Sequence, residues 1–577
     1  MRPIATLKAV LLGLAVAVPA AAQTPTQTLS GVLTGTTTLS ANEVYLIDGE
    51  VYVDNGAVLN IPAGTVLKGR QNPTAGTGTA SVLVVQRGGM INATGTADAP
   101  IIFTAEADDV TDAFDTNESQ RGLWGGVVIL GNATNNRGER TIEGIDAGPR
   151  TTYGPGAGFP VDDEDNSGTL RYVSIRHAGF TLTADAEING LTLGGVGRGT
   201  TLEYVEVFAN SDDSFEFFGG TVNGKYLVGA FSGDDDLDWD TGYTGNLQFV
   251  FSLKDESGDV GRCIEGDGSA SPFTAAPMSS PVVSNLTCVG SGLGSDPGGS
   301  DAGGPTFALR DNTGGFIYNS ILTQFQTDRG GIDLEPLAEN QTDRTTSTEQ
   351  NFFDGELDIR NNIFFDFSTG TDVSDIVRRD NTALETAIGD RNRFFSPGLI
   401  NVVDGPGDES ASVFDDARDQ DGVLDPRPAE NANAASGADF SLFGLDDDFF
   451  DEVDYLGAFA PAPTPAWIER WTALDQMGYL SPFATPAEVS PSAAFALTVG
   501  PNPTAGDATV RFTLDRAQRA RLALYDVLGR EVSAVEGTFP SGEGSATLAT
   551  STLPAGVYVL RFEGESGAVT RQLSVVR

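Results

Sequence analysis

An internal repeat with a period of about 22 residues constrains the fold more than any other feature of the chain. The segment Tyr204–Phe217 contains an alternating strand pattern followed by Asp212-Asp213, and Tyr226–Trp239 repeats that order with Asp234-Asp235-Asp236. Another step of the same length reaches Gln248–Ser257. A fixed period of this kind, with short strands and turns rich in Gly, Asn and Asp, is typical of a β-solenoid whose coils stack at about 4.8 Å. The sequence therefore predicts that one repeat forms one coil.

Weaker copies of the pattern extend over most of the chain. Leu170–Ile175 recurs as Leu202–Val207 at a longer spacing, which indicates a loop inserted at a turn. Further copies lie at Val283–Cys288, Phe316–Leu322 and Ile359–Phe365, and strand patterns at Val51–Leu67 and Val82–Phe103 precede them. We therefore expect an all-β chain in which residues 23–481 form a solenoid with inserted loops.

The composition excludes several classes of function. The chain has 80 acidic residues against 34 Lys and Arg, for a net charge of -46, whereas nucleic acids and anionic membranes require a basic face. The single histidine, His177, and the two cysteines are too few for a poly-His zinc site, a zinc finger or a Cys-ligated iron–sulfur cluster. Nucleic acid is therefore not an expected partner.

Residues 1–22 have the pattern of a secretory signal peptide. Arg2 and Lys8 precede a short apolar run, Ala9–Val18, and small residues end at Ala22 before Gln23. This order predicts cleavage between Ala22 and Gln23. No later run is long and apolar enough to span a bilayer, so we expect an exported protein without a transmembrane segment.

A change in composition near residue 490 indicates a domain boundary. Residues 494–577 contain eight acidic residues and eight arginines, so the negative charge lies in the residues before them. Three prolines among Ser and Ala mark residues 482–493 as a linker. Short alternating strands separated by turns then predict a small Ig-like β-sandwich over residues 494–577.

This C-terminal segment resembles the type A sorting domain of the type IX secretion system. The matching runs are Pro501-Asn502-Pro503, Leu524–Arg530, Leu553–Tyr558 and Gln572–Val576. The resemblance implies that the type IX machinery carries the protein from the periplasm across the outer membrane, usually removes this domain, and releases the protein or attaches it to the cell surface. It implies nothing about what the protein does there.

Residues 40–480 resemble right-handed parallel β-helix proteins of the pectate-lyase-like superfamily. Within that group the chain is similar to large secreted bacterial proteins marked by runs of Asp-Asp, Gly-Gly and Asp-x-Asp. The resemblance implies the fold and says little about activity, because one fold hosts many functions. Enzymes of this fold commonly act on acidic polysaccharides.

The two cysteines, Cys263 and Cys288, are separated in the sequence by about one coil plus a short insertion. Stacked coils would bring their Cα atoms into the range of a disulfide, and export makes oxidation favourable. We therefore expect a disulfide, with two buried free thiols as the alternative.

The repeat also superposes acidic side chains on one another. Its register places Asp212 on Asp234, Asp213 on Asp235 and Glu216 on Asp238. Stacked carboxylates repel each other, and a cation that is coordinated by oxygen atoms, calcium above all, would relieve the repulsion. The predicted metal ligands are Asp212, Asp213, Asp234, Asp235, Asp236, Asp238 and Glu256. The alternative is a solvated acidic edge whose side chains cap their own turns.

Candidates for catalysis lie on the same acidic face, between residues 211 and 257. A polysaccharide lyase would need a base, for which Lys254 is the first candidate and Arg262 and Arg310 are further ones, and a hydrolase would need two carboxyl groups, for which Asp213 and Asp235 are candidates. The favoured alternative for Lys254 is a local counter-ion to Asp255 and Glu256. No other cofactor is expected.

Two further features have structural interpretations. His177 lies outside any Gly-His-Gly run, and no Arg-x-Lys follows, so we expect a structural histidine. Phe215 and Leu237 are expected in the core, whereas Trp239 and Tyr243 are candidates for a sugar-stacking surface. Residues 466–480 have helical spacing and are expected to close the C-terminal end of the solenoid, which otherwise exposes strand edges.

Taken together, the sequence predicts an exported β-helix protein with a binding or structural role, adhesive or in contact with glycans. The alternative is a polysaccharide lyase or glycoside hydrolase that uses the acidic face. The two differ in whether a base stands free beside the carboxylates.

Overall fold

The computed structural model divides the chain into two compact units, Met1–Phe483 and Ala484–Arg577. It describes residues 24–71, 80–183, 186–255, 257–259, 261–269, 272–293, 296–298, 304–327, 330–338, 344–378, 381–402, 418, 420, 422–481, 497–500, 504, 506–514, 518–525, 530–539, 542–564 and 567–577. The predicted signal peptide and cleavage site at Ala22 and Gln23, the linker 482–493 and Glu256 lie outside these residues.

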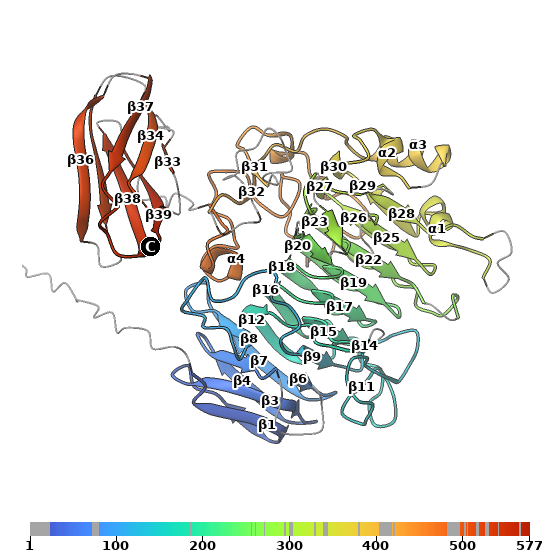
Figure 1. Cartoon of the computed structure of the whole chain (residues 1–577). Coiled ribbons are helices and arrows are strands. Elements are labelled where there is room, and N and C mark those ends of the chain that lie inside the picture. Colours follow the sequence, from blue (N-terminus) through green and yellow to red (C-terminus); the bar gives the residue numbers. More distant parts are fainter. Residues whose placement is uncertain are drawn as a thin grey trace, which may run out of the picture. The chain divides into compact units, whose positions relative to one another are not determined.

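The first unit is a parallel β-helix whose 24 strands form three ribbons, here called A, B and C (Figure 1). Ribbon A contains β2 (Thr36–Thr38), β4 (Val58–Pro62), β7 (Met90–Thr94), β26 (Gly315–Tyr318) and β29 (Leu357–Arg360). Ribbon B contains β5 (Val66–Gly69), β8 (Ile101–Ala105), β27 (Ile321–Phe325) and β30 (Ile363–Phe367), and the first two strands, β1 (Gln27–Leu33) and β3 (Val44–Val53), run through ribbon B into ribbon C.

Long strands bend from ribbon A into ribbon B in the middle coils. They are β12 (Gly168–Arg176), β16 (Thr201–Phe208), β18 (Gly224–Ala230), β20 (Asn246–Leu253) and β23 (Val282–Val289). Ribbon C contains β6 (Val82–Val85), β9 (Gly126–Leu130), β15 (Leu191–Gly194), β17 (Phe215–Phe218), β19 (Leu237–Asp240), β22 (Ile264–Asp267), β25 (Phe307–Arg310) and β28 (Ile332–Leu334). The predicted parallel β-helix is thus confirmed.

The stacking register confirms the first step of the repeat and corrects the second. Val205 pairs with Leu227, as the repeat predicts, but Leu227 pairs with Val250, which lies one position further along the chain than an equal step would reach. On ribbon C the corresponding step, from Leu237 to Ile264, is longer still. The expected superposition of Gln248 on Tyr226 is therefore wrong, because short insertions sit at different turns of the same coil.

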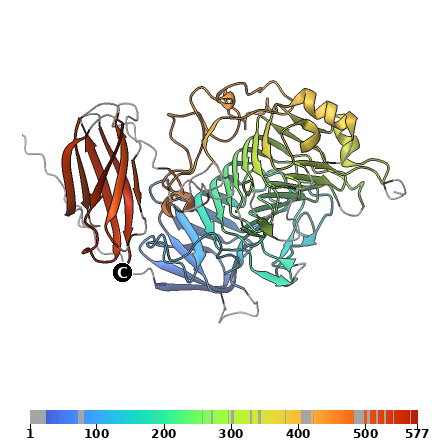
Figure 2. The ribbon, with the colours of Figure 1, turned by 45° about the horizontal axis from the view of Figure 1, so that its top comes forward.

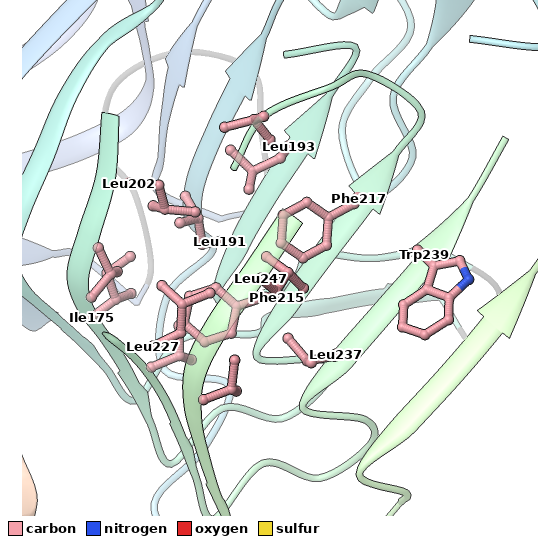
Figure 3. Close-up of a cluster of buried hydrophobic side chains, with 14 of the residues drawn as sticks. Ile175, Leu191, Leu193, Leu202, Phe215, Phe217, Leu227, Leu237, Trp239 and Leu247 are labelled. Atoms are coloured by element: carbon pink, nitrogen blue, oxygen red, sulfur yellow. The ribbon is translucent and has the colours of Figure 1, made fainter. Parts of the chain in front are cut away.

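Inward side chains of the three ribbons form one long core (Figure 3). Phe215 and Leu237 belong to it, as predicted. Trp239 and Tyr243 also belong to it, with 1% and 0% of their surface exposed, so the prediction that they form a sugar-stacking surface is wrong. Strand alternation points Trp239 inward with its stacking partner Phe217, and Tyr243 lies flat on the Phe217 ring at 4.4 Å.

The bend between ribbons A and B carries a ladder of residues with positive φ. The first four are aromatic, and successive ring centroids lie 4.4, 4.3 and 4.9 Å apart. In the later coils asparagine occupies the same position, because it tolerates the left-handed region better than most side chains. The ladder comprises Tyr172, Tyr204, Tyr226, Phe249, Asn285, Asn319 and Asn361.

Residues 422–481, here called the strap, run back over the outer face of ribbon B and over the later coils of ribbon A. They include the 3-10 helix η1 (Asn433–Ala435) and the helix α4 (Ala473–Gln476). The strap side chains Ile468, Trp471 and Leu474 bury the outward Phe208 and Phe231. Residues 466–480 therefore cover the middle of the solenoid beside β16, and the prediction that they close its end is wrong (Figure 1).

Three other helices cover the C-terminal end of the solenoid (Figure 2). They are α1 (Thr348–Asp354), α2 (Val373–Ile376) and α3 (Thr382–Arg391), and Phe352, Ile376, Leu384 and Ile388 from them join the core. Small two-stranded sheets lie in the loops: β10 (Arg140–Thr141) with β11 (Thr152–Tyr153), β13 (Thr181–Thr183) with β14 (Ala186–Glu187), β21 (Ser257–Asp259) with β24 (Asp296–Gly298), and β31 (Leu399–Asn401) with β32 (Asp425–Pro428).

The predicted disulfide is confirmed. Cys263 begins ribbon C of one coil, and Cys288 lies in ribbon B of the next coil, opposite Ser252. Their Cα atoms are 6.3 Å apart, and both residues are fully buried. The bond therefore ties two neighbouring coils together inside the core.

The second unit contains two antiparallel sheets around a core of its own. One sheet holds β33 (Leu497–Gly500), β34 (Ala508–Leu514) and β37 (Gly542–Leu548), and the other holds β35 (Gln518–Tyr525), β36 (Glu531–Phe539), β38 (Gly556–Gly564) and β39 (Gly567–Val575). Phe512 of the first sheet contacts Phe562 of the second. In the described part of the chain, no helix has the length and apolar character needed to cross a membrane.

Candidate functional site

The acidic residues singled out by the sequence lie in the turns that lead from ribbon B to ribbon C. In one coil this turn connects β16 to β17, and in the next it connects β18 to β19. Asn210 holds the first turn by donating its amide to the main-chain oxygen of Asp213 at 2.7 Å. Asp213 accepts from the backbone N–H of Asp235 at 2.8 Å, which joins the two turns.

The turns bring five predicted or neighbouring acids into two overlapping groups. Carboxylate oxygens of Asp212, Asp213 and Asp234 lie within 4.8 Å of one another, and so do those of Asp213, Glu216 and Asp238. Asp213 belongs to both groups. Its exposed fraction is 7% and that of Glu216 is 6%, so the shared part of the site is almost closed to solvent.

The electrostatics of these groups are unfavourable without a positive charge. Burial, with the nearby charges of Asp212 and Asp234, raises the pKa of Asp213 well above its usual value. Burial, followed by the charges of Glu143 and Asp238, does the same to the pKa of Glu216. Such shifts mean that burial first, and then the neighbouring carboxylates, disfavour the ionised forms of these groups. A bound cation would remove that cost.

Asp238 adds an independent sign of a missing partner. Its Oδ1 atom is buried and has no hydrogen-bond donor among the residues that the structure describes. Burial, and then the charge of Asp213, raises the pKa of Asp238 well above its usual value. A buried carboxylate oxygen without a donor is costly, and Asp238 belongs to the group with Asp213 and Glu216.

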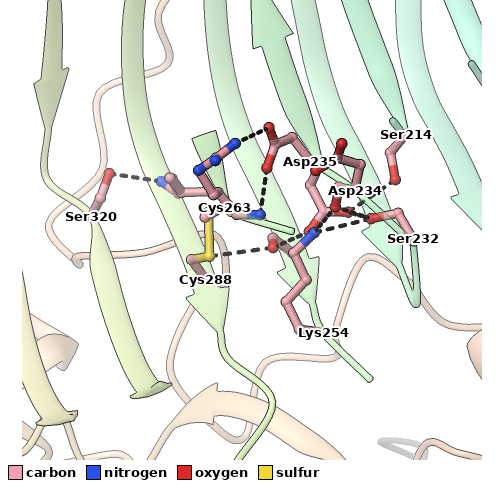
Figure 4. The surroundings of a disulfide bond; sticks show 12 residues. Ser214, Ser232, Asp234, Asp235, Lys254, Cys263, Cys288 and Ser320 are labelled. Carbon is pink, nitrogen blue, oxygen red and sulfur yellow. Dashed lines mark hydrogen bonds and ion pairs between the residues drawn. A yellow bond between two sulfur atoms is a disulfide. The ribbon is translucent and has the colours of Figure 1, made fainter. Parts of the chain in front are cut away.

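Asp235 and Asp236, two other predicted ligands, have different partners, and Figure 4 shows where Asp235 and Lys254 lie. Asp235 accepts hydrogen bonds from the backbone N–H and from the guanidinium of Arg262. The carboxylate of Asp236 accepts from three serine hydroxyls and pairs with the ammonium of Lys254 at 3.1 Å. The three hydroxyls belong to Ser214, Ser232 and Ser252. Neither residue belongs to the two acidic groups.

Lys254 is fully engaged and only 1% exposed. Besides Asp236, its ammonium contacts the Ser232 hydroxyl at 3.0 Å and the main-chain oxygen of Asp234 at 2.6 Å. The expected counter-ion role towards Asp255 is wrong, because Asp255 pairs with Arg121 instead. Lys254 thus balances a charge from the preceding coil.

The other basic candidates are paired as well. Arg262 contacts both Asp235 and Glu265, and Arg310 contacts Glu265 and also Asp267 at 2.9 Å. Glu265 stacks on Asp238 and extends the acidic column by one coil. The sequence did not reveal Glu265, because an insertion lengthens the step that separates it from Asp238. The strand pattern Ile264–Asp267 was the available signal.

His177 lies in the interior, and its Nε2 has no hydrogen-bond partner among the described residues. It is fully buried, and its Nδ1 lies 2.6 Å from the main-chain oxygen of Gln120. Burial lowers its pKa, so the ring is neutral and donates through Nδ1. His177 belongs to neither acidic group.

The arrangement has a clear chemical capacity. It offers several oxygen donors on adjacent turns, which is the ligand set of hard divalent cations. The acidic clusters can therefore bind a metal ion. The three basic residues considered for proton abstraction, Lys254, Arg262 and Arg310, each contact at least one carboxylate.

Comparison with known proteins identifies both units. A family described as pectate-lyase like beta helix domain matches residues 31–393. A second family, described as secretion system C-terminal sorting domain, matches residues 498–576. None of the curated proteins matches the chain. The sorting domain indicates export to the cell surface or secretion, with the secretion machinery as a partner.

Proposed function

This chain belongs to the pectate-lyase-like β-helix family, and from that premise we propose that it acts outside the cell as a binding or structural protein and not as an enzyme. The observation that carries the proposal is the state of Lys254, which is buried and held by Asp236 and Ser232. A lyase base must reach a substrate proton, and this ammonium reaches only the protein. Arg262 is also mostly buried and paired with Asp235, whereas Arg310 is paired with Asp267 but keeps 46% of its side chain exposed.

The acidic turns have a role in this proposal, which is to hold calcium. Calcium prefers six to eight oxygen ligands in flexible geometry, and the turns supply carboxylates from Asp212, Asp213 and Asp234 beside Glu216 and Asp238. Magnesium demands a stricter octahedron and zinc prefers nitrogen and sulfur. A calcium ion on Asp213 would link two coils and stabilise the face that meets an extracellular partner.

The test is a calcium titration followed by thermal unfolding of the whole chain. A ligand that binds only the folded state at about 100 times its Kd adds about 2.7 kcal/mol, so millimolar calcium should raise Tm by several degrees. Asp213→Asn should abolish this shift, because Asp213 serves both groups. Asp165→Asn, a change at an acid outside both groups, is the matched control and should keep it.

If calcium leaves Tm unchanged in the unmodified protein, the turns are a solvated acidic edge and the calcium proposal is wrong. If Asp165→Asn loses the shift as well, the effect is not local to the turns. Magnesium at the same concentration should give a smaller shift, which tests the choice of ion.

A hydrolase is the second candidate, and the raised pKa of Glu216 is the observation that favours it. A carboxyl group whose pKa is raised is better suited to act as a general acid. Carboxylate oxygens of Glu216, Asp213 and Asp238 lie within 4.8 Å of one another. The inverting mechanism needs carboxyl groups about 6.5–9.5 Å apart, so this group is too close for it. Release of reducing ends from polysaccharides, lost in Glu216→Gln, would favour the hydrolase over the binding protein.

A further inference from the structure

The outer face of ribbon A carries a ladder of threonine and asparagine over seven successive coils. Register pairs join Thr38 to Asn60, Asn60 to Asn92, Asn92 to Thr169 and Thr169 to Thr201. Asn223 comes one residue before the partner of Leu202, so it stands opposite Thr201. Its Oδ1 accepts a hydrogen bond from the backbone N–H of Asn246, which is the next member. We call this set the polar ladder: Thr38, Asn60, Asn92, Thr169, Thr201, Asn223 and Asn246.

Strand alternation fixes the orientation of the polar ladder. The residue next to each member along its strand, such as Leu59, Ile91, Leu170 or Leu202, belongs to the core. Since successive side chains of a strand point to opposite faces, the ladder points outward. Each member is partly or fully exposed to solvent.

The ladder has hydrogen-bonding capacity left over. Asn92 donates to the Oδ1 of Asn60 at 2.9 Å, and Asn60 donates to the Thr38 hydroxyl at 3.2 Å. These bonds align the side chains along the solenoid axis and use only part of each amide. A threonine hydroxyl is both donor and acceptor, so the outward hydroxyls of Thr169 and Thr201 can serve a ligand in either way.

The charge around the ladder selects the ligand. No member carries a charge, in a chain whose net charge is -46. In the adjacent column Arg171 stands opposite Glu203, at 3.6 Å, and Glu203 stands opposite Lys225. The negative field of the whole chain would repel a polyanion, whereas a neutral polymer has no net charge for the field to repel.

We propose that the polar ladder binds a neutral, extended polysaccharide that lies along the solenoid axis with about one sugar unit per coil. Coils repeat at about 4.8 Å, so the six intervals of the ladder span about 29 Å. A sugar unit of a straight β-1,4-linked chain advances by close to one such interval. Successive units of such a chain are turned over relative to each other, so equivalent hydroxyls recur at every second unit and face every second coil of the ladder. The inference rests on the proposed binding role and names its ligand class.

Co-sedimentation of the whole chain with microcrystalline cellulose, a neutral β-1,4-linked polymer, tests the inference. Thr169→Glu combined with Thr201→Glu places two charges in the centre of the ladder and should weaken binding about tenfold or more, which corresponds to about 1.4 kcal/mol or more. Thr382→Glu with Thr386→Glu adds the same two charges on the exposed face of α3 and should leave binding unchanged. Thr169→Ser with Thr201→Ser keeps both hydroxyls and should keep binding.

Three outcomes would overturn the inference. The unmodified protein fails to sediment with cellulose, the Glu pair binds cellulose as well as the unmodified protein, or the unmodified protein sediments with polygalacturonate, an acidic polymer, in the same buffer and not with cellulose. The assay is run in a chelator, so its result is separate from the calcium test of the proposed function. Equal Tm values for the three variants show that the ladder changes leave the fold intact.

Discussion

At the residue scale, the same side chain takes opposite roles according to partners that lie one coil away. Asp236 accepts from three serine hydroxyls and an ammonium, whereas Asp213, which precedes it by one coil and one residue, faces other carboxylates. Both stand in runs of aspartate that look alike in the sequence. The hydroxyls of Ser214 and Ser252 come from neighbouring coils, so only the stacking register reveals which aspartate is neutralised.

Asp165 provides a pH-dependent test at this scale. Burial raises its pKa from 3.8 to about 6. Between these two values the folded state binds more protons than the unfolded state, so stability falls as pH rises through this window and levels off above it. Allowing for solvent screening, we expect a loss of about 1–2 kcal/mol between about pH 4 and about pH 7.

Asp165→Asn should remove this component of the pH dependence. The measurement is urea unfolding followed by tryptophan fluorescence, because all four tryptophans lie in the first unit. The difference between the unmodified protein and the variant isolates Asp165 from other buried acids such as Glu206. Parallel stability profiles for the two proteins would contradict the prediction.

At the element scale, the strap covers the outward apolar side chains of ribbon B, which have no second sheet against them. The outward Phe208 and Phe231 would face water without it. Glu206, also outward and fully buried, accepts from the backbone N–H of Ala473 at 2.6 Å at the start of α4. The strap is thus the second layer of this face, and it has few turns of regular structure.

Trp471 tests the contribution of the strap. Its ring is fully buried and lies edge-on to Tyr172 and Tyr204 at 5.8 and 6.2 Å. Trp471→Ala should lower the free energy of unfolding by about 3–5 kcal/mol, the usual cost of deleting a buried aromatic side chain. Phe443→Ala, at a strap residue that is 71% exposed, should cost less than about 1 kcal/mol. If both variants lose the same free energy of unfolding, the cavity left by the Trp471 ring is not the cause of the loss.

The sequence predicted the coils better than the segments that cover them. The first step from Val205 to Leu227 follows from the repeat, because both coils have the same length. The step from Leu237 to Ile264 does not, because the insertion has no counterpart in the preceding coil. The position of the strap depends on contacts between residues that are far apart in the sequence. One example is the contact of Arg470 with Asp98. No local pattern specifies such a contact.

The candidate site was predictable to the same limited degree. The repeat identified Asp212, Asp213 and Asp234 as neighbours, since their turns have the same length in both coils. It did not distinguish Asp235, which Arg262 neutralises, because Arg262 lies beyond an insertion. Trp239 was misplaced because alternation alone does not say which face of a short strand is inside.

At the scale of the whole molecule, the net charge of -46 sets a dependence on salt. Like charges spread over a folded chain repel each other and destabilise it, and salt screens this repulsion. The Debye length falls from about 10 Å at 0.1 M to about 3 Å at 1 M. We expect Tm of the first unit to rise by a few degrees over this range of NaCl, and equally with KCl. A fall in Tm would show that buried ion pairs such as Lys254 with Asp236 outweigh the surface repulsion.

The strap has a consequence for how this molecule can evolve. Its anchors lie on coils far apart: Arg470 pairs with Asp98, Asp451 with Lys225, and the main-chain oxygen of Gly437 accepts from Asn361. A coil duplicated between these anchors would move them apart by about 4.8 Å, which no hydrogen bond tolerates. Open repeat arrays gain and lose units freely because each unit touches only its neighbours. Here a change in the number of coils requires a matching change in the strap, so the two must be inherited as a pair.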